Sequence, residues 1–233
     1  SLDGMKDFIN ATQNYKVLKG VQSNLFKCFL PQSWYFANKT GVQGFLHPEG
    51  VYDDSAGGVL REGIYKRLRY HFQFQNEKKL FEIGNRNKFS INIFGGNSQV
   101  VNFQNISNLF MPKTIDESFE HSKEEPVPGI KNSEGQWDLR GHTKRILTIT
   151  EKTLGIFSKL FESEEANPLQ TKLPSVHSQQ VISVLEKFGN YPHRLRDLGN
   201  DYYSTVCFDE TNRQNDGTIK RETRFPKDNG ELI

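Results

Sequence analysis

The chain has 233 residues, of which 35% are hydrophobic and 12% aromatic, enough apolar side chains for one large domain or one and a half ordinary ones. The formal net charge is only +2, so the charge of the whole chain gives no reason to expect nucleic-acid binding. Any basic surface has to be local. No apolar run approaches the roughly 18 residues of a membrane span, and Cys28 and Cys207 lack a C-x-x-C partner, which predicts reduced thiols in a cytosolic protein.

The first part of the chain has a weak helical pattern. Residues 1–20 are predicted to be helix or loop, and from Val21 to Phe36 apolar residues recur at helical spacing, with Pro31 expected to bend or split that helix. The chain opens without Met and stops without a capping signal. We therefore expect both ends to be boundaries cut from a longer protein.

The stretch from Gly41 to Gly95 carries the strongest alternation between strand and helix patterns. A short strand from Gln43 to Leu46 stops at Pro48, and a polar loop runs from His47 to Gly58. A helix and two strands follow, with apolar positions at Leu60, Ile64, Leu68, Phe72, Phe74, Phe89, Ile91 and Ile93. Strand, helix, strand, strand predicts half of an open α/β sheet. Ligands bind beyond the carboxyl ends of parallel strands in such sheets, so the loop 47–58 is the candidate site.

Downstream, the periodicity is less regular. The residues 112–141 hold prolines, glycines and charges, which predicts a surface connector. The other expected elements are one or two strands within Val100–Phe103 and Ile106–Phe110, a strand at Arg145–Ile149, a helix at Thr150–Phe161, a helix capped by Ser175, a strand at Asp201–Phe208 and a hairpin turning at Asp216–Gly217.

The usual catalytic motifs do not occur in this sequence. It contains neither a G-x-S-x-G nucleophile elbow nor a Walker loop. The six histidines have no metal-ligand spacing, so we expect no metal site; they are His47, His71, His121, His142, His177 and His193.

Two groups of residues allow both a functional and a structural interpretation. Glu49, Asp53 and Asp54 in the polar loop are acid–base catalysts, metal ligands or solvated carboxylates. Phe89, at the start of a strand, is either a core aromatic or a face on which a planar ligand stacks.

The C-terminal region is the best local candidate for nucleic-acid contact. Its basic and amide side chains include Arg213, Gln214, Lys220, Arg221 and Arg224. Arg and Gln read base edges, and Lys and Arg neutralise phosphates. Acidic residues are interspersed among them, so an ordinary solvated hairpin stays an equal alternative.

Characteristic blocks are spread over nearly the whole chain. They are Asn24-Leu-Phe-Lys-Cys-Phe-Leu, Gly41-Val-Gln-Gly-Phe-Leu-His-Pro-Glu-Gly-Val-Tyr-Asp-Asp, His71-Phe-Gln-Phe-Gln-Asn-Glu, Leu80-Phe-Glu, Lys88-Phe-Ser-Ile-Asn-Ile-Phe and Asp209-Glu-Thr-Asn-Arg-Gln-Asn-Asp-Gly-Thr-Ile-Lys-Arg-Glu-Thr-Arg-Phe-Pro. These blocks resemble the second half of the catalytic domain of adenine-specific DNA methyltransferases, in particular that of large restriction–modification enzymes. The segment from Gly44 to Gly95 is the most specific of them.

The resemblance implies a Rossmann-like domain that binds S-adenosylmethionine, a downstream region that recognises DNA, and a target adenine flipped out of the duplex. In that family an Asn-or-Asp-Pro-Pro-aromatic loop holds the adenine amine. This sequence has nine prolines but no Pro-Pro pair, and no glycine-rich turn for the cofactor. We therefore expect those parts upstream, and an isolated fragment that is inactive and does not bind the cofactor tightly. By resemblance Phe89 forms one face of the base pocket, with Pro48, Glu49 and Asp53 lining it.

The resemblance also implies a domain organisation. It assigns 1–40 to a leading helical segment, 41–111 to the C-terminal half of the methyltransferase sheet, 112–144 to a connector and 145–233 to an α+β region that begins the target-recognition part. The expected partners are double-stranded DNA, the upstream half of the same protein or a second copy of the fragment, without a membrane, in the cytoplasm of a bacterium or archaeon. The alternatives are a non-catalytic DNA-binding or assembly module and a scaffold domain without its own ligand.

Overall fold

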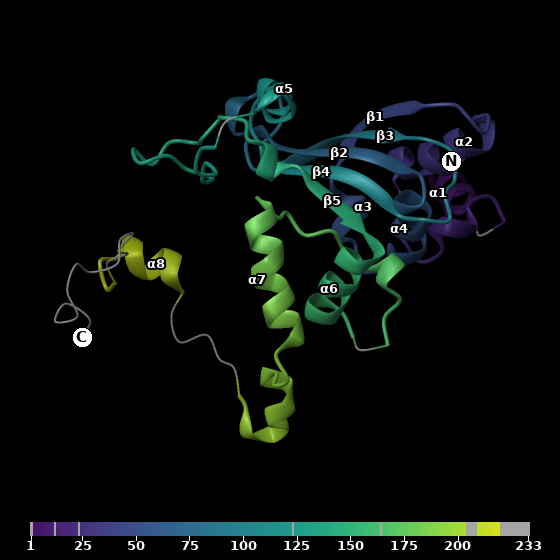
Figure 1. Ribbon diagram of the computed structural model, residues 1–233. Coiled ribbons are helices and arrows are strands. Elements are labelled where there is room, and N and C mark those ends of the chain that lie inside the picture. Colours follow the sequence, from purple (N-terminus) through teal and green to yellow (C-terminus); the bar gives the residue numbers. More distant parts are fainter. Residues whose placement is uncertain are drawn as a thin grey trace. The chain divides into compact units, whose positions relative to one another are not determined.

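Five strands form one mixed sheet in the order β1-β3-β2-β4-β5 in the computed structural model of the protein (Figure 1). The strands are β1 (Gln43–Pro48), β2 (Leu68–Gln75), β3 (Lys88–Phe94), β4 (Asn102–Leu109) and β5 (Leu147–Thr150). β3 lies antiparallel between β1 and β2, β2 and β4 are parallel, and β5 is antiparallel to β4. β1, β2 and β4 therefore run in one direction, and their carboxyl ends meet at one edge.

The structure describes residues 2–11, 13–22, 24–122, 124–163, 165–203 and 209–219, in two parts that divide at residue 190. The helices of the first part are α1 (Leu2–Asn10), η1 (Lys16–Leu18), α2 (Leu25–Phe36), α3 (Gly50–Asp53), α4 (Gly58–Tyr65), η2 (Asn76–Lys78), α5 (Lys113–Glu120), η3 (Thr143–Arg145), α6 (Glu151–Phe161), η4 (Pro168–Gln170) and α7 (Gln179–Asn190). The second part holds η5 (Leu195–Asp201) and α8 (Glu210–Asn215). No helix in these described ranges is long and apolar enough to cross a membrane.

Each face of the sheet buries its own apolar cluster. Because side chains alternate along a strand, Ser90, Asn92 and Phe94 of β3 point to one face and Phe89 and Ile91 to the other. The first face packs under α3, α4 and α6 (Figure 1), around a core that includes Tyr52, Leu60, Ile64, Tyr65, Phe103, Leu154 and Phe157. The second face is covered in part by α5 and buries the smaller cluster Phe74, Phe89, Ile106 and Leu109.

The predicted α/β class is confirmed, and local capping explains several element starts. The Asn24 side chain accepts from the N–H of Phe26 at the start of α2, and Thr150 accepts from the N–H of Thr153 at the start of α6. Pro31 lies inside α2 without splitting it into two helices.

Several boundaries differ from the sequence predictions. α4 ends at Tyr65, so Leu68 belongs to β2 rather than to the helix, and the expected loop 47–58 contains α3. The expected connector contains the helix α5, whose Thr114 and Ser118 are buried. The sequence did not indicate this helix, because its amphipathic pattern is short and interrupted by charged residues. Of the one or two strands expected within 100–110 the structure has one, β4, and the helix expected from Ser175 begins at Gln179.

The C-terminal hairpin prediction is wrong where the structure describes it. Residues 210–215 form α8, capped by Asp209, whose side chain accepts from the N–H of Asn212. The turn follows at Asp216 and Gly217, where Gly217 has a φ of 79°. Residues 201–203 are not strand, and the rest of both predicted elements lies outside the described residues. The helix forms because the cap and the Arg213–Asp216 ion pair stabilise it locally.

The domain boundaries inferred from the family resemblance stay a prediction. β5 comes from the segment assigned to the recognition region, yet it pairs with β4 in the same sheet, from Asn102 opposite Thr150 to Asn105 opposite Leu147. The first compact part extends to residue 190.

Candidate functional site

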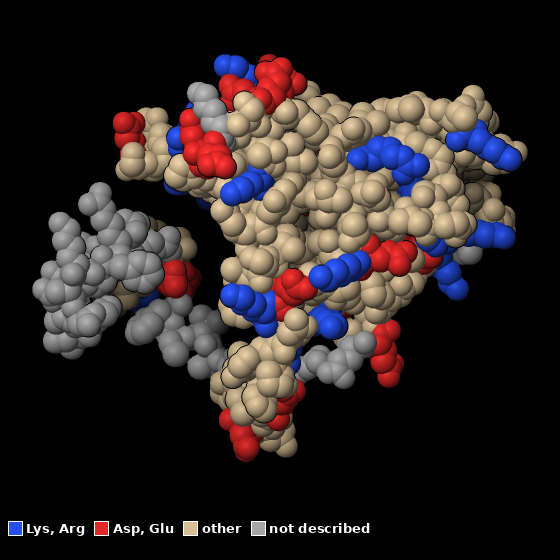
Figure 2. Space-filling model, in the orientation of Figure 1, with Lys and Arg blue, Asp and Glu red and all other residues tan. Residues whose placement is uncertain are grey.

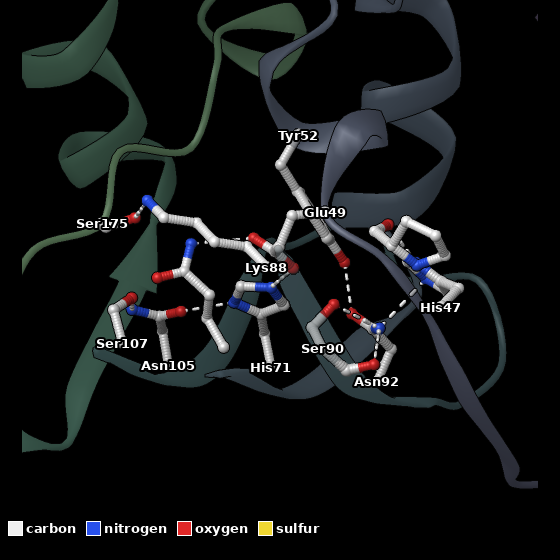
Figure 3. A network of polar contacts seen from close by, with 12 residues as sticks. His47, Glu49, Tyr52, His71, Lys88, Ser90, Asn92, Asn105, Ser107 and Ser175 are labelled. Carbon is white, nitrogen blue, oxygen red and sulfur yellow. Dashed lines mark hydrogen bonds and ion pairs between the residues drawn. The ribbon is translucent and has the colours of Figure 1, made fainter. Parts of the chain in front are cut away.

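A buried network of polar side chains lies at the sheet face beneath α3 (Figure 3). The carboxylate of Glu49, which directly follows β1, contacts His71 of β2, with Oε1 3.0 Å from Nε2, and accepts from Gln73 Nε2 at 2.9 Å. The other ring nitrogen of His71 bonds to Asn105 Oδ1 of β4, whose amide nitrogen donates to Ser107 at 3.1 Å. The network therefore links β1, β2 and β4, the three strands that run in the same direction.

Glu49 is ionised in this environment. Burial alone would raise its pKa, but the charge of His71 and hydrogen bonds from His71, Ser90 and Gln73 outweigh that cost and lower the pKa to about 2. His71 and Glu49 have side-chain exposures of only 1% and 8%, so solvent does not screen this pair. The two side chains form a buried structural contact rather than an accessible acid and base.

A second group of polar contacts extends the network towards β1. Tyr52 of α3 donates from its hydroxyl to Asn92 Oδ1, and Asn92 Nδ2 bonds to Ser90 Oγ at 2.8 Å and to His47 Nε2 at 3.0 Å. Burial raises the pKa of Tyr52 well above its usual value, so the phenol stays a donor. Lys88 reaches across this edge to Ser175, with Nζ 3.2 Å from Oγ. These contacts fasten α3 to the sheet and set the direction in which the chain leaves β1.

The other face of the sheet carries an apolar groove. Two adjoining cavities of about 530 Å³ each share Leu46, Phe81 and Phe89 in their walls, and we call them together the Phe81 groove. The other lining residues are Gly44, Phe45, Phe74, Leu80, Ile91 and Pro112 in one cavity, and His47, Pro48, Ile83, Asn87 and Lys88 in the other.

The two phenylalanine rings shared by both cavities, Phe81 and Phe89, differ in solvent exposure. Phe89 is 7% exposed, stacks on Phe74 at 5.3 Å with an interplanar angle of 3°, and meets the edge of Phe81 at 5.0 Å. Phe81 is 43% exposed and Leu46 is 52% exposed. Phe81 therefore presents a free ring surface in the groove, and Phe89 supports it from below.

A buried asparagine holds the loop that carries Phe81. Asn76 is fully buried, and its amide nitrogen donates to the carbonyl oxygens of Phe81 and Ile83, both at 2.9 Å. Its Oδ1 accepts from the N–H of Phe81 at 3.1 Å. Three hydrogen bonds to one side chain pre-order the loop, so the exposed apolar side chains are held in place.

The structure brings together two of the four residues proposed for the base pocket. Pro48 and Phe89 line the same cavity of the Phe81 groove. Glu49 points to the opposite face into the buried network, and Asp53 is exposed on α3. The neighbouring Asp54 binds Lys27 at 2.9 Å, a hydrogen bond that lowers the pKa of that carboxyl.

Sequence reasoning missed Phe81, Asn76 and the pairing of Glu49 with His71. Phe81 belongs to the block Leu80-Phe-Glu, but it lies in a loop without periodicity, so no pattern indicated its exposure. An Asn before a polar turn is the only local signal for the Asn76 contacts. The Glu49–His71 contact joins positions 22 residues apart, and nothing in local sequence predicts it.

The candidate DNA-binding residues are described only in part. Arg213 and Gln214 lie on α8, where Arg213 binds Asp216 at 3.0 Å. Lys220, Arg221 and Arg224 lie outside the described residues. Their role stays a prediction.

The chain contains two glycine doublets, Gly57-Gly58 and Gly95-Gly96. Side chains or backbone fill the space at both glycine doublets: a Cβ at Gly58 would meet Gln170 at 3.1 Å, and one at Gly96 would meet the carbonyl oxygen of Lys39 at a clashing distance. Neither doublet is an open cradle for a phosphate or a sulfonium group. Among the residues that the structure describes, no group of three His, Cys, Asp or Glu side chains could hold a metal ion.

Neither a family model nor a curated protein matches the chain. Solved structures match it weakly, and three of them are restriction–modification enzymes. The ATP-dependent Type ISP enzyme LlaBIII bound to DNA has 13% identity over 44% of this chain and 8% of that chain, with a TM-score of 0.30. The type IIG restriction endonuclease BpuSI has 12% identity over 65% of this chain and 18% of that chain, with a TM-score of 0.38. A type I restriction–modification system has 14% identity over 86% of this chain and 42% of that chain, with a TM-score of 0.36. The chain spans less than half of each, and a likeness of this strength assigns no activity to it.

Proposed function

We propose that the chain is the downstream part of an S-adenosylmethionine-dependent, adenine-specific DNA methyltransferase of a restriction–modification system. The observation that carries this proposal is the meeting of Pro48 and Phe89 in the Phe81 groove. The family resemblance assigns both residues to the pocket of the flipped base. Pro48 and Phe89 are about forty positions apart in the sequence, so only the fold brings them together.

The groove suits a planar, mostly apolar ligand. Its walls are the rings of Phe81 and Phe89 with Leu46 and Ile83, and Asn87 and Lys88 also line it. A base leaves the duplex only if the site replaces the stacking that it loses, and an aromatic ring provides about 1–3 kcal/mol per base. Phe81 is the exposed ring, so it takes the stacking role and Phe89 positions it.

The catalytic loop and the cofactor pocket would belong to polypeptide outside these 233 residues. The sequence has no Pro-Pro pair, and its glycine doublets are filled by protein atoms. The chain alone is therefore proposed to lack methyltransferase activity and to bind S-adenosylmethionine only weakly.

Methyl transfer by the longer protein tests the proposal. The protein that contains the upstream polypeptide is expected to transfer labelled methyl groups from S-adenosylmethionine to adenine in duplex DNA, and the 233-residue chain is not. Mass analysis of the digested DNA distinguishes N6-methyladenine from methylated cytosine. Methylated cytosine, or no methylation by the longer protein, would refute the assignment.

Calorimetry separates the claim about the cofactor from the claim about activity. Titration of the 233-residue chain with S-adenosylmethionine should show no tight binding. Tight one-to-one binding would contradict a cofactor site outside the chain, whatever the methylation result.

A further inference from the structure

A polar cavity of about 800 Å³ lies within the segment 125–140, in the part of the chain whose composition predicts a surface connector. Two backbone hydrogen bonds fold this segment back on itself. The N–H of Asn132 donates to the carbonyl oxygen of Gln136 at 2.9 Å, and the N–H of Asp138 donates to that of Ile130 at 3.0 Å. The cavity therefore has ordered walls.

Arg140 lines this cavity, and the carboxylate of Asp138 fixes its guanidinium. Arg140 Nε donates to Asp138 Oδ1 at 3.0 Å, Nη2 donates to Oδ2, and Oδ1 also accepts from the backbone N–H of Arg140 at 3.1 Å. The side chain of Asp138 is only 3% exposed, whereas that of Arg140 is 71% exposed. Hydrogen bonds from Arg140 lower the pKa of Asp138, so the carboxylate stays charged. The pair therefore orients a guanidinium that solvent can reach.

The outer edge of this guanidinium is available to a ligand. A guanidinium carries five N–H groups in one plane, and Asp138 occupies the edge formed by Nε and Nη2. Nη1 has no hydrogen-bond partner among the described residues. Nη1 and Nη2 each keep one N–H on the outer edge, and two parallel donors of this kind match a pair of adjacent acceptors.

The backbone of Arg140 is anchored to the sheet by the buried side chain of Arg145, which is 1% exposed. Arg145 Nη1 donates to the carbonyl oxygen of Arg140 at 3.1 Å. Its Nη2 donates to the carbonyl oxygens of Ser107 and Asn108 at 3.2 and 3.1 Å. These two residues lie near the carboxyl end of β4. Arg140 is therefore held at the edge of the sheet where ligands bind in open α/β folds.

The helix α5 holds the next residue and connects this region to the Phe81 groove. Glu117 Oε2 accepts from the N–H of Gly141 at 3.0 Å. The backbone approaches α5 so closely here that a Cβ at Gly141 would clash with Glu117. Pro112, directly before α5, lines the Phe81 groove. One short helix thus borders the groove and positions the loop that carries Arg140.

The charges of the segment favour a directional contact over a general attraction to DNA. Residues 125–140 contain two cations, Lys131 and Arg140, and three carboxylates, Glu125, Glu134 and Asp138, for a net charge of −1. Basic and acidic side chains are interspersed over the face drawn in Figure 2. Binding through phosphates gains affinity with each added cation, which this segment does not supply. A bidentate contact to a base edge requires only one oriented guanidinium.

We propose that Arg140 reads a guanine of the duplex that contains the target base, donating from Nη1 and Nη2 to O6 and N7, and that Asp138 is its positioning residue. Arginine to guanine is the commonest specific contact in the major groove. The proposal rests on the proposed function for DNA as the ligand. It goes beyond that function because it places base readout in the connector, upstream of the candidate DNA-binding residues on α8 and after it.

Selection of random duplexes by binding tests the readout without relying on methylation. The longer protein that includes the upstream polypeptide should select a sequence with a preferred guanine. Arg140→Ala should lower the preference at one guanine about tenfold and leave the other positions unchanged. Lys131→Ala, which removes a cation from the same segment, should keep that preference. An unchanged preference in Arg140→Ala, or an equal loss of affinity for all sequences, would overturn the proposal, and the second result would indicate a phosphate contact.

A modified base gives a second test on the same DNA. Replacement of the selected guanine by 7-deazaguanine, which has a carbon in place of N7, should weaken binding of the natural protein about fivefold. Binding of Arg140→Ala should not change, because this variant has already lost the contact. Equal weakening of both proteins would overturn the proposal. Asp138→Asn keeps the side-chain size and should lower the guanine preference, and full preference in that variant would remove the positioning role.

The methylation assay distinguishes this proposal from the proposed function. Adenine methylation together with an unchanged guanine preference in Arg140→Ala would refute the readout and leave the proposed function in place. A guanine preference that depends on Arg140, without methylation, would support the readout and refute the proposed function. A longer protein that does not bind DNA would refute both.

Discussion

Glu49 and His71 form a hydrogen-bonded pair that joins the end of β1 to the middle of β2, with Oε1 3.0 Å from Nε2 and both side chains almost completely buried. Gln73, Asn105 and Ser107 satisfy the remaining polar atoms around it. Buried pairs of this kind are costly to break, because the remaining polar group loses its hydrogen-bond partner away from water.

Replacement of Glu49 tests the energetic role of the pair. Glu49→Ala should lower the free energy of unfolding by about 1–3 kcal/mol, since His71 and Gln73 would be left buried without their acceptor. Asp53→Ala, which removes an exposed carboxylate four positions later, should change stability by less than about 0.5 kcal/mol. Urea denaturation of both variants measures the difference. Equal stability of the two variants would show that the pair contributes nothing.

The same carboxylate predicts a pH dependence. The pKa of Glu49 is lowered in the folded protein to about 2, so its contribution to stability is fully present above the unfolded value of 4.5 and is lost as the pH falls from there towards 2. Full loss corresponds to about 3 kcal/mol. The stability gap between the natural chain and Glu49→Gln, measured by denaturation at several pH values, should narrow below pH 4.5. A constant gap from pH 7 to pH 3 would contradict this assignment.

Phe89 and Phe81 should respond differently to truncation. Phe89 is buried against Phe74, so Phe89→Ala should destabilise the chain by about 3–5 kcal/mol. Phe81 is half-exposed, and Phe81→Ala should cost far less stability. Thermal and chemical unfolding of the 233-residue chain measures both. A Phe81→Ala chain as unstable as Phe89→Ala would show that Phe81 is a core residue.

Activity gives the complementary prediction for Phe81. In the longer protein, Phe81→Ala should weaken stacking on the target base by about 1–3 kcal/mol, which corresponds to roughly a 5- to 150-fold loss in methylation efficiency. Phe81→Tyr keeps the aromatic face and should retain most of the activity. The measurement is the rate of methyl transfer at subsaturating DNA. Full activity of Phe81→Ala would remove the stacking role.

Asn76 should stabilise the loop that carries Phe81. Asn76→Ala removes its hydrogen bonds to the carbonyl oxygens of Phe81 and Ile83, at a cost of about 0.5–1.5 kcal/mol per bond. Amide exchange in residues 80–84 should accelerate in the variant. Asn85→Ala, at an exposed position in the same loop, is the control. Unchanged exchange in Asn76→Ala would mean that other contacts hold the loop.

The sequence by itself determined the elements with strong local periodicity. β1, β2 and β3 follow from short apolar runs with alternating polar positions, and α6 from the spacing of Leu154, Phe157 and Phe161. Such patterns are local, because a strand or helix that buries one face repeats its apolar residues every second or every third to fourth position. The α/β class followed from these patterns in order along the chain.

Short or mixed patterns were resolved by tertiary contacts. α5 and α3 lie in stretches whose composition predicts loops, and burial of Thr114, Ser118, Val51 and Tyr52 stabilises them as helices. In α8 a side-chain cap and an ion pair form a helix where the turn residues predicted a hairpin. Propensity is a weak prior in such segments, because a few tertiary or capping contacts exceed it.

The candidate site was decided almost entirely by the tertiary structure. Hydrogen bonding across the sheet places β3 between β1 and β2, which brings Pro48 next to Phe89 and turns Glu49 to the opposite face. Adjacent residues on a strand point to opposite faces, so membership of one loop does not imply membership of one pocket. The sequence determined which residue types were present, and the pairing of distant strands decided which of them meet.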